Sequence, residues 1–343
     1  MIRAYITGLA GPLLGAQERA FLRDAAPWGL ILFKRNVQSP DQVKRLIGEA
    51  RECVGRNLPV LVDQEGGRVQ RLGPPHWPVY PPGAAYGRLY DAHPAAGLAA
   101  ARLGARLIAS DLNDLGIDVD CLPLGDVPVV GADPIIGDRA YGTSAEKVSA
   151  IAAAVAEGLM AGGVLPVVKH LPGHGRPTAD SHQTLPVVTM EREVLEATDF
   201  AAFRPLARLP LGMTAHVVFT SIDPAAPATT SPTIIREVIR DSIGFTGALM
   251  SDDVSMGALT GTIGERTHAA LAAGCDLALH CNGEPGEMEA VAAAAPPLAG
   301  EAAARAEAAL AARRKPTDID LAAARKEFFA AMSQAAGPQM AKS

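Results

Sequence analysis

The chain has 343 residues, 48% hydrophobic and 20% charged, and its 31 Lys and Arg against 37 Asp and Glu give a formal net charge of -6. This length equals about two average domains, but closed α/β barrels use it as one. The mildly acidic balance, without a long basic run, argues against nucleic acid or an anionic membrane surface as a partner and leaves a small neutral or cationic ligand open.

The cysteines and the N-terminus predict where the chain resides. Cys53, Cys121, Cys275 and Cys281 include no CxxC pair, so we expect buried, reduced thiols and no zinc or redox centre. The N-terminal apolar stretch is short and is interrupted by Gly and Pro. A secretory signal or a membrane span of about 20 residues needs a longer apolar run. We therefore expect a cytoplasmic protein.

Short apolar runs bounded by Gly, Pro or charged residues predict eight strands, at residues 4–11, 29–36, 58–67, 116–127, 164–175, 211–219, 247–254 and 274–282. Segments of helical character separate them, among them residues 39–53, 95–116, 143–163 and 191–207. This alternation of nearly continuous apolar strands with helices favours an α/β fold, a single (β/α)8 barrel of the TIM type, over an open sheet.

The barrel accounts for most of the chain. We expect one catalytic domain over residues 1–343, with the barrel core at about 4–283 and an Ala-rich helical tail at about 284–335 packed on the barrel exterior. Two helix starts carry capping patterns, Ser39 followed by Asp41 and Thr143 followed by Glu146.

Several of the predicted strands end in polar or charged residues. In a barrel these carboxyl ends converge on the face where active sites lie. One pocket is therefore expected to collect five residues from four segments: Asp63, Lys169, His170, His216 and Asp252. Any one of them could instead form an ion pair or a cap at a strand end, but all five sharing that fate is much less expected.

Residues 167–186 are the segment richest in reactive side chains, with three histidines, a lysine, an arginine and an aspartate after a buried strand. His170 and His174 have the spacing of zinc ligands on a helix, but Pro172 and Gly173 lie between them and prevent a helix. We therefore expect no metal.

Two further patterns suggest acid-base and nucleophilic chemistry. Asp180 lies two residues before His182, where a carboxylate can orient an imidazole and stabilise its cation, although this tripeptide alone could be a surface turn. Asp252 and Asp253 are adjacent at a strand end, so both side chains cannot point into the barrel mouth. If Asp252 points inward, it can act as a nucleophile or electrostatic stabiliser, and Asp253 is then expected to cap the following turn or pair with a basic neighbour.

The motifs DQEGGRVQRL (63–72), GDRAYG (137–142), KHLPGHG (169–175), DSH (180–182), MTAH (213–216) and SDDVSM (251–256) occur in this order. In this combination the chain resembles the β-N-acetylhexosaminidases of glycoside hydrolase family three. Within that family it is similar to the single-domain bacterial β-N-acetylglucosaminidases that recycle peptidoglycan. The resemblance covers roughly residues 4–283, and KHxPGHG followed by DSH is its most specific part.

The resemblance implies retaining hydrolysis through a covalent glycosyl-enzyme, with an exo-acting enzyme that releases terminal N-acetylglucosamine from 1,6-anhydro-muropeptides. It assigns the nucleophile to Asp252, the acid/base to His182 and the support of that histidine to Asp180. It assigns the grip on the sugar to Asp63, Arg71, Arg139, Lys169 and His170, with His174, His216 and Met256 in less direct roles. It implies no cofactor, a small saccharide or muropeptide as the partner, and a monomer.

Three alternatives stay open at this point. A histidine acid/base carries no negative charge that would repel phosphate, so the same barrel could be a phosphorylase. A sugar-binding barrel without catalysis would require Asp252 and His182 to serve structure alone. A metal-dependent hydrolase would lose its activity on chelation.

Overall fold

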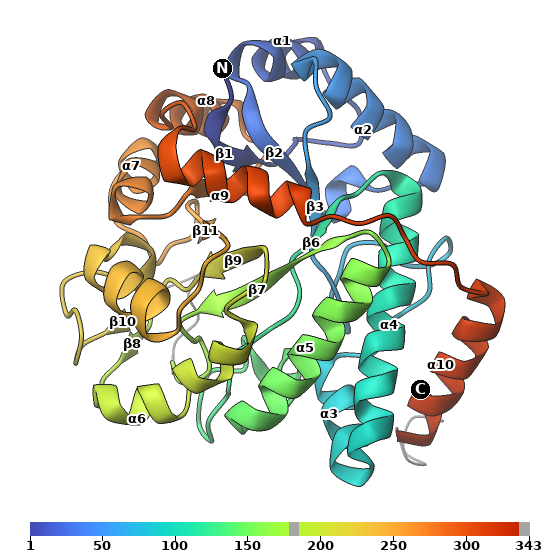
Figure 1. Ribbon diagram of the computed structural model, residues 1–343. Helices are drawn as coiled ribbons and strands as arrows, with labels where there is room; N and C mark the ends of the chain where they lie inside the picture. Colours follow the sequence, from blue (N-terminus) through green and yellow to red (C-terminus); the bar gives the residue numbers. More distant parts are fainter. Residues whose placement is uncertain (178–184, 336–343) are drawn as a thin grey trace.

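The protein forms a closed parallel barrel, seen in a computed structural model that describes residues 1–177 and 185–335 (Figure 1). All eight predicted strands are present, so the predicted (β/α)8 fold is confirmed. In order around the barrel they are β1 (Arg3–Thr7), β12 (Leu277–His280), β11 (Ala248–Asp253), β9 (Leu211–Thr214), β7 (Leu165–Leu171), β6 (Val119–Asp120), β3 (Val60–Val62) and β2 (Pro27–Leu32).

The barrel strands are buried on both faces, which is why their sequences are continuously apolar. Every residue of Pro27–Leu32 and of Leu165–Leu171 is buried. Side chains such as Ile31 and Val167 fill the barrel interior, whereas Leu30 and Val168 pack toward the surrounding helices. Each such side chain contributes about 2 kcal/mol by leaving water.

The helices lie around the barrel strands (Figure 1). They are α1 (Ala16–Ala25), α2 (Pro40–Val54), α3 (Gly83–Ala92), α4 (Pro94–Leu115), α5 (Ala145–Ala161), α6 (Arg192–Ala197), α7 (Ile263–Ala273), α8 (Pro285–Ala294), α9 (Gly300–Ala311) and α10 (Leu321–Ala335). A nine-residue π-helix, η6 (Ile234–Ser242), precedes β11. Among the residues that the structure describes, no helix combines the length and the apolar character needed to cross a membrane.

Two sequence expectations about helices need correction. The helix predicted at 191–207 ends at Ala197 and is followed by two short 3-10 turns, η3 (Phe200–Ala202) and η4 (Arg204–Leu206). Pro205 lies in the second turn, where its missing N–H is incompatible with a continuing α-helix. The N-cap of α5 is Ser144 and not Thr143, and it makes no side-chain capping bond. Ser39 does cap α2, since its hydroxyl accepts from the Gln42 N–H.

Short elements in the loops form the upper face of the barrel, which is the face at the carboxyl ends of its strands. The hairpin of β4 (Gln64–Gly66) and β5 (Val69–Gln70) follows β3 directly, and a 3-10 turn, η2 (Gly137–Arg139), lies in the connection between β6 and α5. A separate two-stranded parallel sheet joins β8 (Val187–Val188) to β10 (Val218–Phe219). The hairpin and η2 bring Glu65 and Arg139 together above the strand ends.

Only part of the helical tail packs on the outside of the barrel, as the sequence predicted for all of it. Helix α10 packs outside, where Phe328 contacts Tyr80 and Tyr86. Helix α9 instead crosses the barrel strands (Figure 1), and its Ala306 and Ala309 join the cluster that fills the barrel interior. Alanine has no bulky side chain, so the helix can approach the barrel closely enough to close its amino end.

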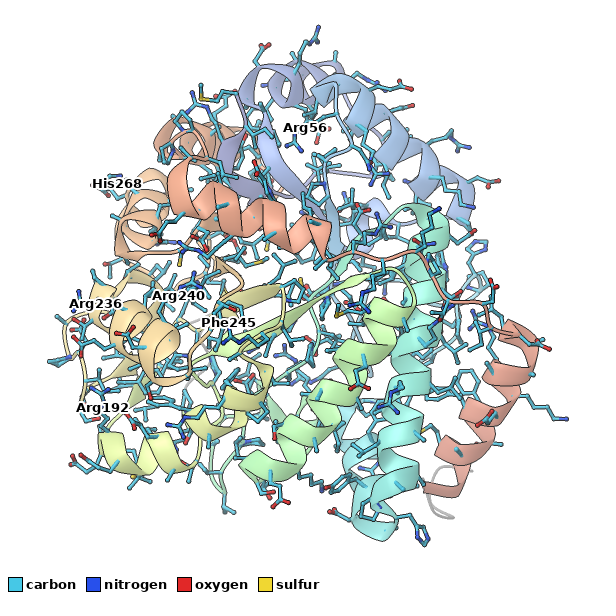
Figure 2. All side chains as sticks on the ribbon, in the orientation of Figure 1. Arg56, Arg192, Arg236, Arg240, Phe245 and His268 are labelled. Carbon is cyan, nitrogen blue, oxygen red and sulfur yellow. The ribbon has the colours of Figure 1, made fainter. Side chains whose placement is uncertain are left out.

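Two buried carboxylates attach α9 and the residues after it to the amino end of the barrel. Asp276, 2% exposed, accepts from Arg305 of α9 (Nη2 to Oδ1, 2.7 Å), from Arg240 of η6 (Nη2 to Oδ2, 2.9 Å) and from the Leu249 N–H (2.9 Å). Figure 2 shows Arg240 beside Phe245, over whose ring its guanidinium lies at 5.6 Å. Asp118 binds Arg51 of α2 and Arg313, which follows α9, in the same manner.

We predict that Asp276→Ala lowers the free energy of unfolding by about 3 kcal/mol, because two arginines and a backbone N–H lose their buried partner. Urea denaturation followed by circular dichroism measures this. The matched control is Glu301→Ala, which removes an 89% exposed partner of the same Arg305 and is expected to cost at most about 0.5 kcal/mol. Equal losses in the two variants would contradict the role assigned to Asp276.

Candidate active site

A cavity of about 280 Å³ opens at the carboxyl end of the barrel strands. Eight of the residues singled out in the sequence line it: Asp63, Arg71, Arg139, Lys169, His170, His174, Asp252 and Met256. His216 is fully buried and is not among the lining residues. Asp180 and His182 lie outside the described residues, so the structure places neither of them.

The ammonium group of Lys169 is the centre of a charged network in this cavity. Its Nζ lies 2.9 Å from Asp63 Oδ1 and 2.7 Å from Glu65 Oε1, and the residue is 2% exposed. Arg71 donates to the other oxygen of Asp63 at 2.9 Å, and Arg139 forms a two-bond pair with Glu65 at 2.8 and 2.9 Å. Three cations therefore hold two carboxylates in place.

The network keeps all of its members charged at neutral pH. Burial alone would raise the pKa of Asp63 and of Glu65, but the surrounding cations outweigh it. The pKa of Asp63 lies well below its usual range, and that of Glu65 falls to about 2. Burial likewise opposes the charge on Lys169, but the two carboxylates hold its pKa above the usual range. Such a set of charged donors and acceptors can orient sugar hydroxyls.

Sequence reasoning missed Glu65, although a signal for it was present. Residues at i and i+2 of an extended strand point to the same side, and Glu65 lies two residues after Asp63. Phe33, at the end of the second strand, was missed too. Its ring lies under the guanidinium of Arg71 at 5.1 Å and lines the same cavity, so a cation–π contact supports the arginine in addition to its ion pair.

His170 is oriented by Asp126, a third residue that the sequence did not single out. The His170 Nδ1 lies 2.7 Å from Asp126 Oδ2, and Asp126 Oδ1 accepts from the backbone N–H groups of His170 (3.2 Å) and His174 (2.7 Å). Burial opposes ionisation of Asp126, but His170 and His174 lower its pKa to about 2. The ionised carboxylate accepts a hydrogen bond from the Nδ1–H group, which leaves Nε2 of His170 available to a ligand.

Asp252 enters the cavity from the end of β11 as an ionised carboxylate. Burial would raise its pKa, but His216, His170 and the Asp253 N–H together lower the pKa below its ordinary value. That N–H donates to Asp252 Oδ1 at 2.8 Å. An ionised carboxylate held in this way is a competent nucleophile.

The neighbouring Asp253 serves the backbone, as the sequence predicted. It accepts from the Ser255 N–H at 3.0 Å, from the Ser255 hydroxyl at 2.6 Å and from the Cys281 N–H at 3.1 Å. These bonds hold the turn after β11 against the end of β12. Met256, which lines the cavity, follows in that turn, where its N–H donates to the Asp253 carbonyl.

The buried histidines near the cavity have different environments. Burial, with a contribution from His170, lowers the pKa of His174 to about 4, so this side chain is neutral at neutral pH. His216 places Nε2 2.9 Å from the Asp253 carbonyl oxygen and Nδ1 2.7 Å from Thr229 Oγ1. In residues 1–177 and 185–335 no group of three or more metal-ligating side chains is gathered.

Residues 175–177, which follow β7, are held by hydrogen bonds to two other parts of the chain. Arg176 Nε donates to Asp199 Oδ2 at 2.6 Å, the Asp133 N–H donates to the Pro177 carbonyl at 2.8 Å, and the Val129 N–H donates to the Gly175 carbonyl at 3.1 Å. Burial raises the pKa of Asp199, and the bonds from Arg176 and Thr198 only partly offset this effect. Residues 175–177 are thus bound both to the connection after β6 and to the residues before η3.

Comparisons with known proteins find similar sequences and similar structures. The family model described as the glycosyl hydrolase family 3 N-terminal domain matches residues 13–311. A β-hexosaminidase of Methylococcus capsulatus is 42% identical over 278 residues, which cover 80% of this chain and 81% of that protein. The structure of NagZ from Neisseria gonorrhoeae in complex with N-trifluoroacetyl-D-glucosamine has a TM-score of 0.83 at 31% identity, with 98% of each chain covered. A family 3 β-N-acetylglucosaminidase from Paenibacillus sp. has a TM-score of 0.79 at 29% identity over 97% of this chain, which spans 61% of that longer protein.

We predict that Glu65→Gln lowers the free energy of unfolding by about 3 kcal/mol at neutral pH, and that this difference shrinks in acid. A carboxylate with a depressed pKa stabilises the fold fully above the ordinary pKa of Glu, and loses that contribution as pH falls toward about 2. Urea unfolding of both proteins at pH values of about 7 and about 3 measures the difference.

The control for this prediction is Glu157→Gln, which removes an exposed ion pair with Arg102 and is expected to leave stability unchanged at both pH values. A Glu65→Gln penalty that stays constant between the two pH values would show that the charge of Glu65 is not what stabilises the site.

Proposed function

The chain belongs to glycosyl hydrolase family 3 and is a glycoside hydrolase, and from this premise we propose that it releases terminal non-reducing N-acetyl-β-D-glucosamine. The observation that carries the proposal is the cavity in which Asp63, held by Lys169 and Arg71, lies with an ionised Asp252. A carboxylate can bridge two neighbouring sugar hydroxyls, while cationic donors around it bind the remaining oxygens.

The size of the cavity supports attack at the end of a saccharide. Its volume of about 280 Å³ lies at the small end of ligand sites, which range over about 300–1,000 Å³. Apolar side chains such as Met213 and Leu279 line it beside the charged network. One sugar ring with its acetamido group therefore suits the site, and the rest of the substrate would lie outside it.

The proposed mechanism is retaining hydrolysis. Asp252 attacks the anomeric carbon, so that a bond forms between its carboxylate oxygen and that carbon while the bond to the leaving oxygen breaks. His182 donates a proton to the leaving oxygen and then accepts one from water, which attacks the same carbon and releases Asp252. Asp180 orients His182. The roles of these two residues rest on the motif DSH, since both lie outside the described part of the chain.

We further propose that the natural substrates are fragments of peptidoglycan with a 1,6-anhydro-N-acetylmuramic aglycone, cleaved in the cytoplasm by a monomer. The similar NagZ of Neisseria gonorrhoeae binds N-trifluoroacetyl-D-glucosamine, and the similar protein of Paenibacillus sp. is a β-N-acetylglucosaminidase, which supports the glycone. The aglycone rests on the motif resemblance alone. Comparing turnover of a disaccharide that carries this aglycone with turnover of chitobiose tests it.

We predict that Asp252→Asn lowers kcat on an aryl β-N-acetylglucosaminide by about a thousandfold or more, because the amide cannot form the covalent intermediate. His182→Ala is expected to lose a factor of about 10² to 10⁴, as removal of a general acid does. Chromophore release is measured in buffer with EDTA, with and without phosphate. Asp91→Asn, on the exposed side of an ion pair with Lys147, is the control and should retain wild-type activity.

The outcomes separate the competing chemistries. If phosphate accelerates turnover and a sugar phosphate is formed, the enzyme is a phosphorylase and not a hydrolase. If activity is lost in EDTA, the reaction requires a metal. Proton NMR of the first product decides the stereochemistry, since retention gives the β anomer before mutarotation. Unaffected turnover in Asp252→Asn would refute the assignment of the nucleophile.

A further inference from the structure

The ring of Phe33 contacts two arginines, one in the wall of the cavity and one behind it. The guanidinium carbon of Arg71 lies 5.1 Å from the centre of the ring, and that of Arg35 lies 4.9 Å from it. Phe33 and Arg71 line the cavity, whereas Arg35, an exposed residue of η1 (Lys34–Asn36), is not among the described residues that line it. One aromatic ring therefore connects a residue outside the cavity to a residue that faces the ligand.

Hydrogen bonds alone do not fix the side chain of Arg71. Among the described residues its guanidinium makes one hydrogen bond, from Nη2 to Asp63 Oδ2 at 2.9 Å, and its buried Nε has no hydrogen-bond partner. A single bond of this kind does not determine the plane of the group. An aromatic face attracts a guanidinium within about 6 Å of its centroid, so the ring of Phe33 restricts the orientation that the bond leaves open.

Arg35 is itself fixed at the place where β1 and β12 close the barrel. Its Nε donates to the Leu9 carbonyl at 2.8 Å, and its Nη2 donates to the Cys281 carbonyl. Leu9 follows β1, and Cys281 follows β12 directly. Gly8 leaves room for this contact, since a Cβ there would overlap the Cys281 carbonyl oxygen and lie 2.9 Å from Arg35 Nη2. The guanidinium that contacts the ring is thus held by backbone groups on both sides of the closing pair of strands.

A different residue holds the turn that carries Phe33 and Arg35. Asn36 is fully buried, and its Oδ1 accepts from the Phe33 N–H at 2.9 Å. Its Nδ2 donates to the carbonyls of Leu9 at 3.0 Å and Gly11 at 2.8 Å. Because Asn36 attaches the turn to the chain after β1, the turn does not need the side chain of Arg35 to stay in place.

We propose that Arg35 is a positioning residue that acts through the ring of Phe33 and holds Arg71 in the orientation in which Arg71 and Asp63 bind the sugar. The proposal rests on the proposed function for the identity of that sugar. Two guanidinium groups repel each other, so Arg35 cannot hold Arg71 directly. The attraction of Arg35 for the ring fixes the ring, and the ring fixes Arg71.

The test is a double-mutant cycle of Arg35→Met and Phe33→Leu. The dissociation constant of N-acetylglucosamine is measured by calorimetry, and kcat and KM are measured on an aryl β-N-acetylglucosaminide. We expect each single variant to weaken binding about fivefold while kcat changes by less than about twofold, because the nucleophile is not touched. The double variant should bind within about twofold of Phe33→Leu alone, because Arg35 has no ring left through which to act. Phe33→Tyr, which keeps an aromatic face, should bind like wild type.

Two controls match the substitutions outside the site. Phe245→Leu removes a ring over which Arg240 lies at 5.6 Å, and Arg236→Met removes an exposed arginine of η6 (Figure 2). Both should leave the dissociation constant of N-acetylglucosamine unchanged, even though the loss of the buried Phe245 ring lowers stability.

A second measurement needs no ligand. The motion of the Arg71 side chain is followed by ¹⁵N relaxation of its Nε–H group, with the resonance assigned by its absence from Arg71→Lys. We expect this group to be rigid in wild type and in both controls, and to become mobile in Arg35→Met and in Phe33→Leu.

Arg35→Met that weakens binding as much in the Phe33→Leu background as in wild type would overturn the proposal, because Arg35 would then act through the backbone of Leu9 and Cys281. A folded Arg35→Met with unchanged binding and an unchanged Arg71 resonance would overturn it as well. If Arg35→Met does not fold, Arg35→Lys, which keeps the charge but not the planar group, takes its place with the same criteria. Wild type that neither binds N-acetylglucosamine nor cleaves its aryl glycoside would refute the proposed function, whereas the relaxation of Arg71 would still decide whether Arg35 acts through Phe33.

Discussion

The pairing of the Lys169 ammonium with Asp63 and Glu65 is the constraint on which the upper face of the barrel depends. A buried charge without a partner costs several kcal/mol, so the end of β7 and the hairpin after β3 cannot separate without a large penalty. Arg71 and Arg139 extend the same constraint to the end of the hairpin and to η2. The groups that would bind a ligand are therefore held in place before it arrives. The conformational entropy of these side chains is lost when the protein folds and not when the ligand binds.

Around this centre, three buried histidines share one residue type but differ in function because of their partners. A carboxylate orients His170, burial keeps His174 neutral, and backbone and hydroxyl groups enclose His216. His170 and His216 lower the pKa of Asp252. Residues outside the lining, such as Asp126, thus determine how side chains in the lining are oriented.

The sequence predicted the features that depend on strand periodicity and strand ends. Eight apolar runs gave the barrel, and residues at their carboxyl ends, such as Asp63, Lys169 and Asp252, do line one cavity. It missed Glu65 although the two-residue spacing from Asp63 indicated it. It missed Asp126, because the irregular chain after β6 brings this residue to the site and has no periodic signature. The break of the helix after Ala197 and the place of α9 were missed for a similar reason, since both depend on tertiary packing. The roles of Asp180 and His182 remain predictions from a motif.

Helix α9 has a consequence for how the chain folds during synthesis. The barrel closes only when β12 pairs with β1, and its amino end is covered by residues 300–311, which follow every barrel strand in the chain. Until then the interior-facing side chains of β1 and β2, including Ile6 and Trp28, have no complete core to enter. Most contacts of this kind join residues far apart in sequence, which slows folding and prolongs the exposure of apolar surface. The apolar interior of the first strands is therefore covered completely only after residues 300–311 have been made.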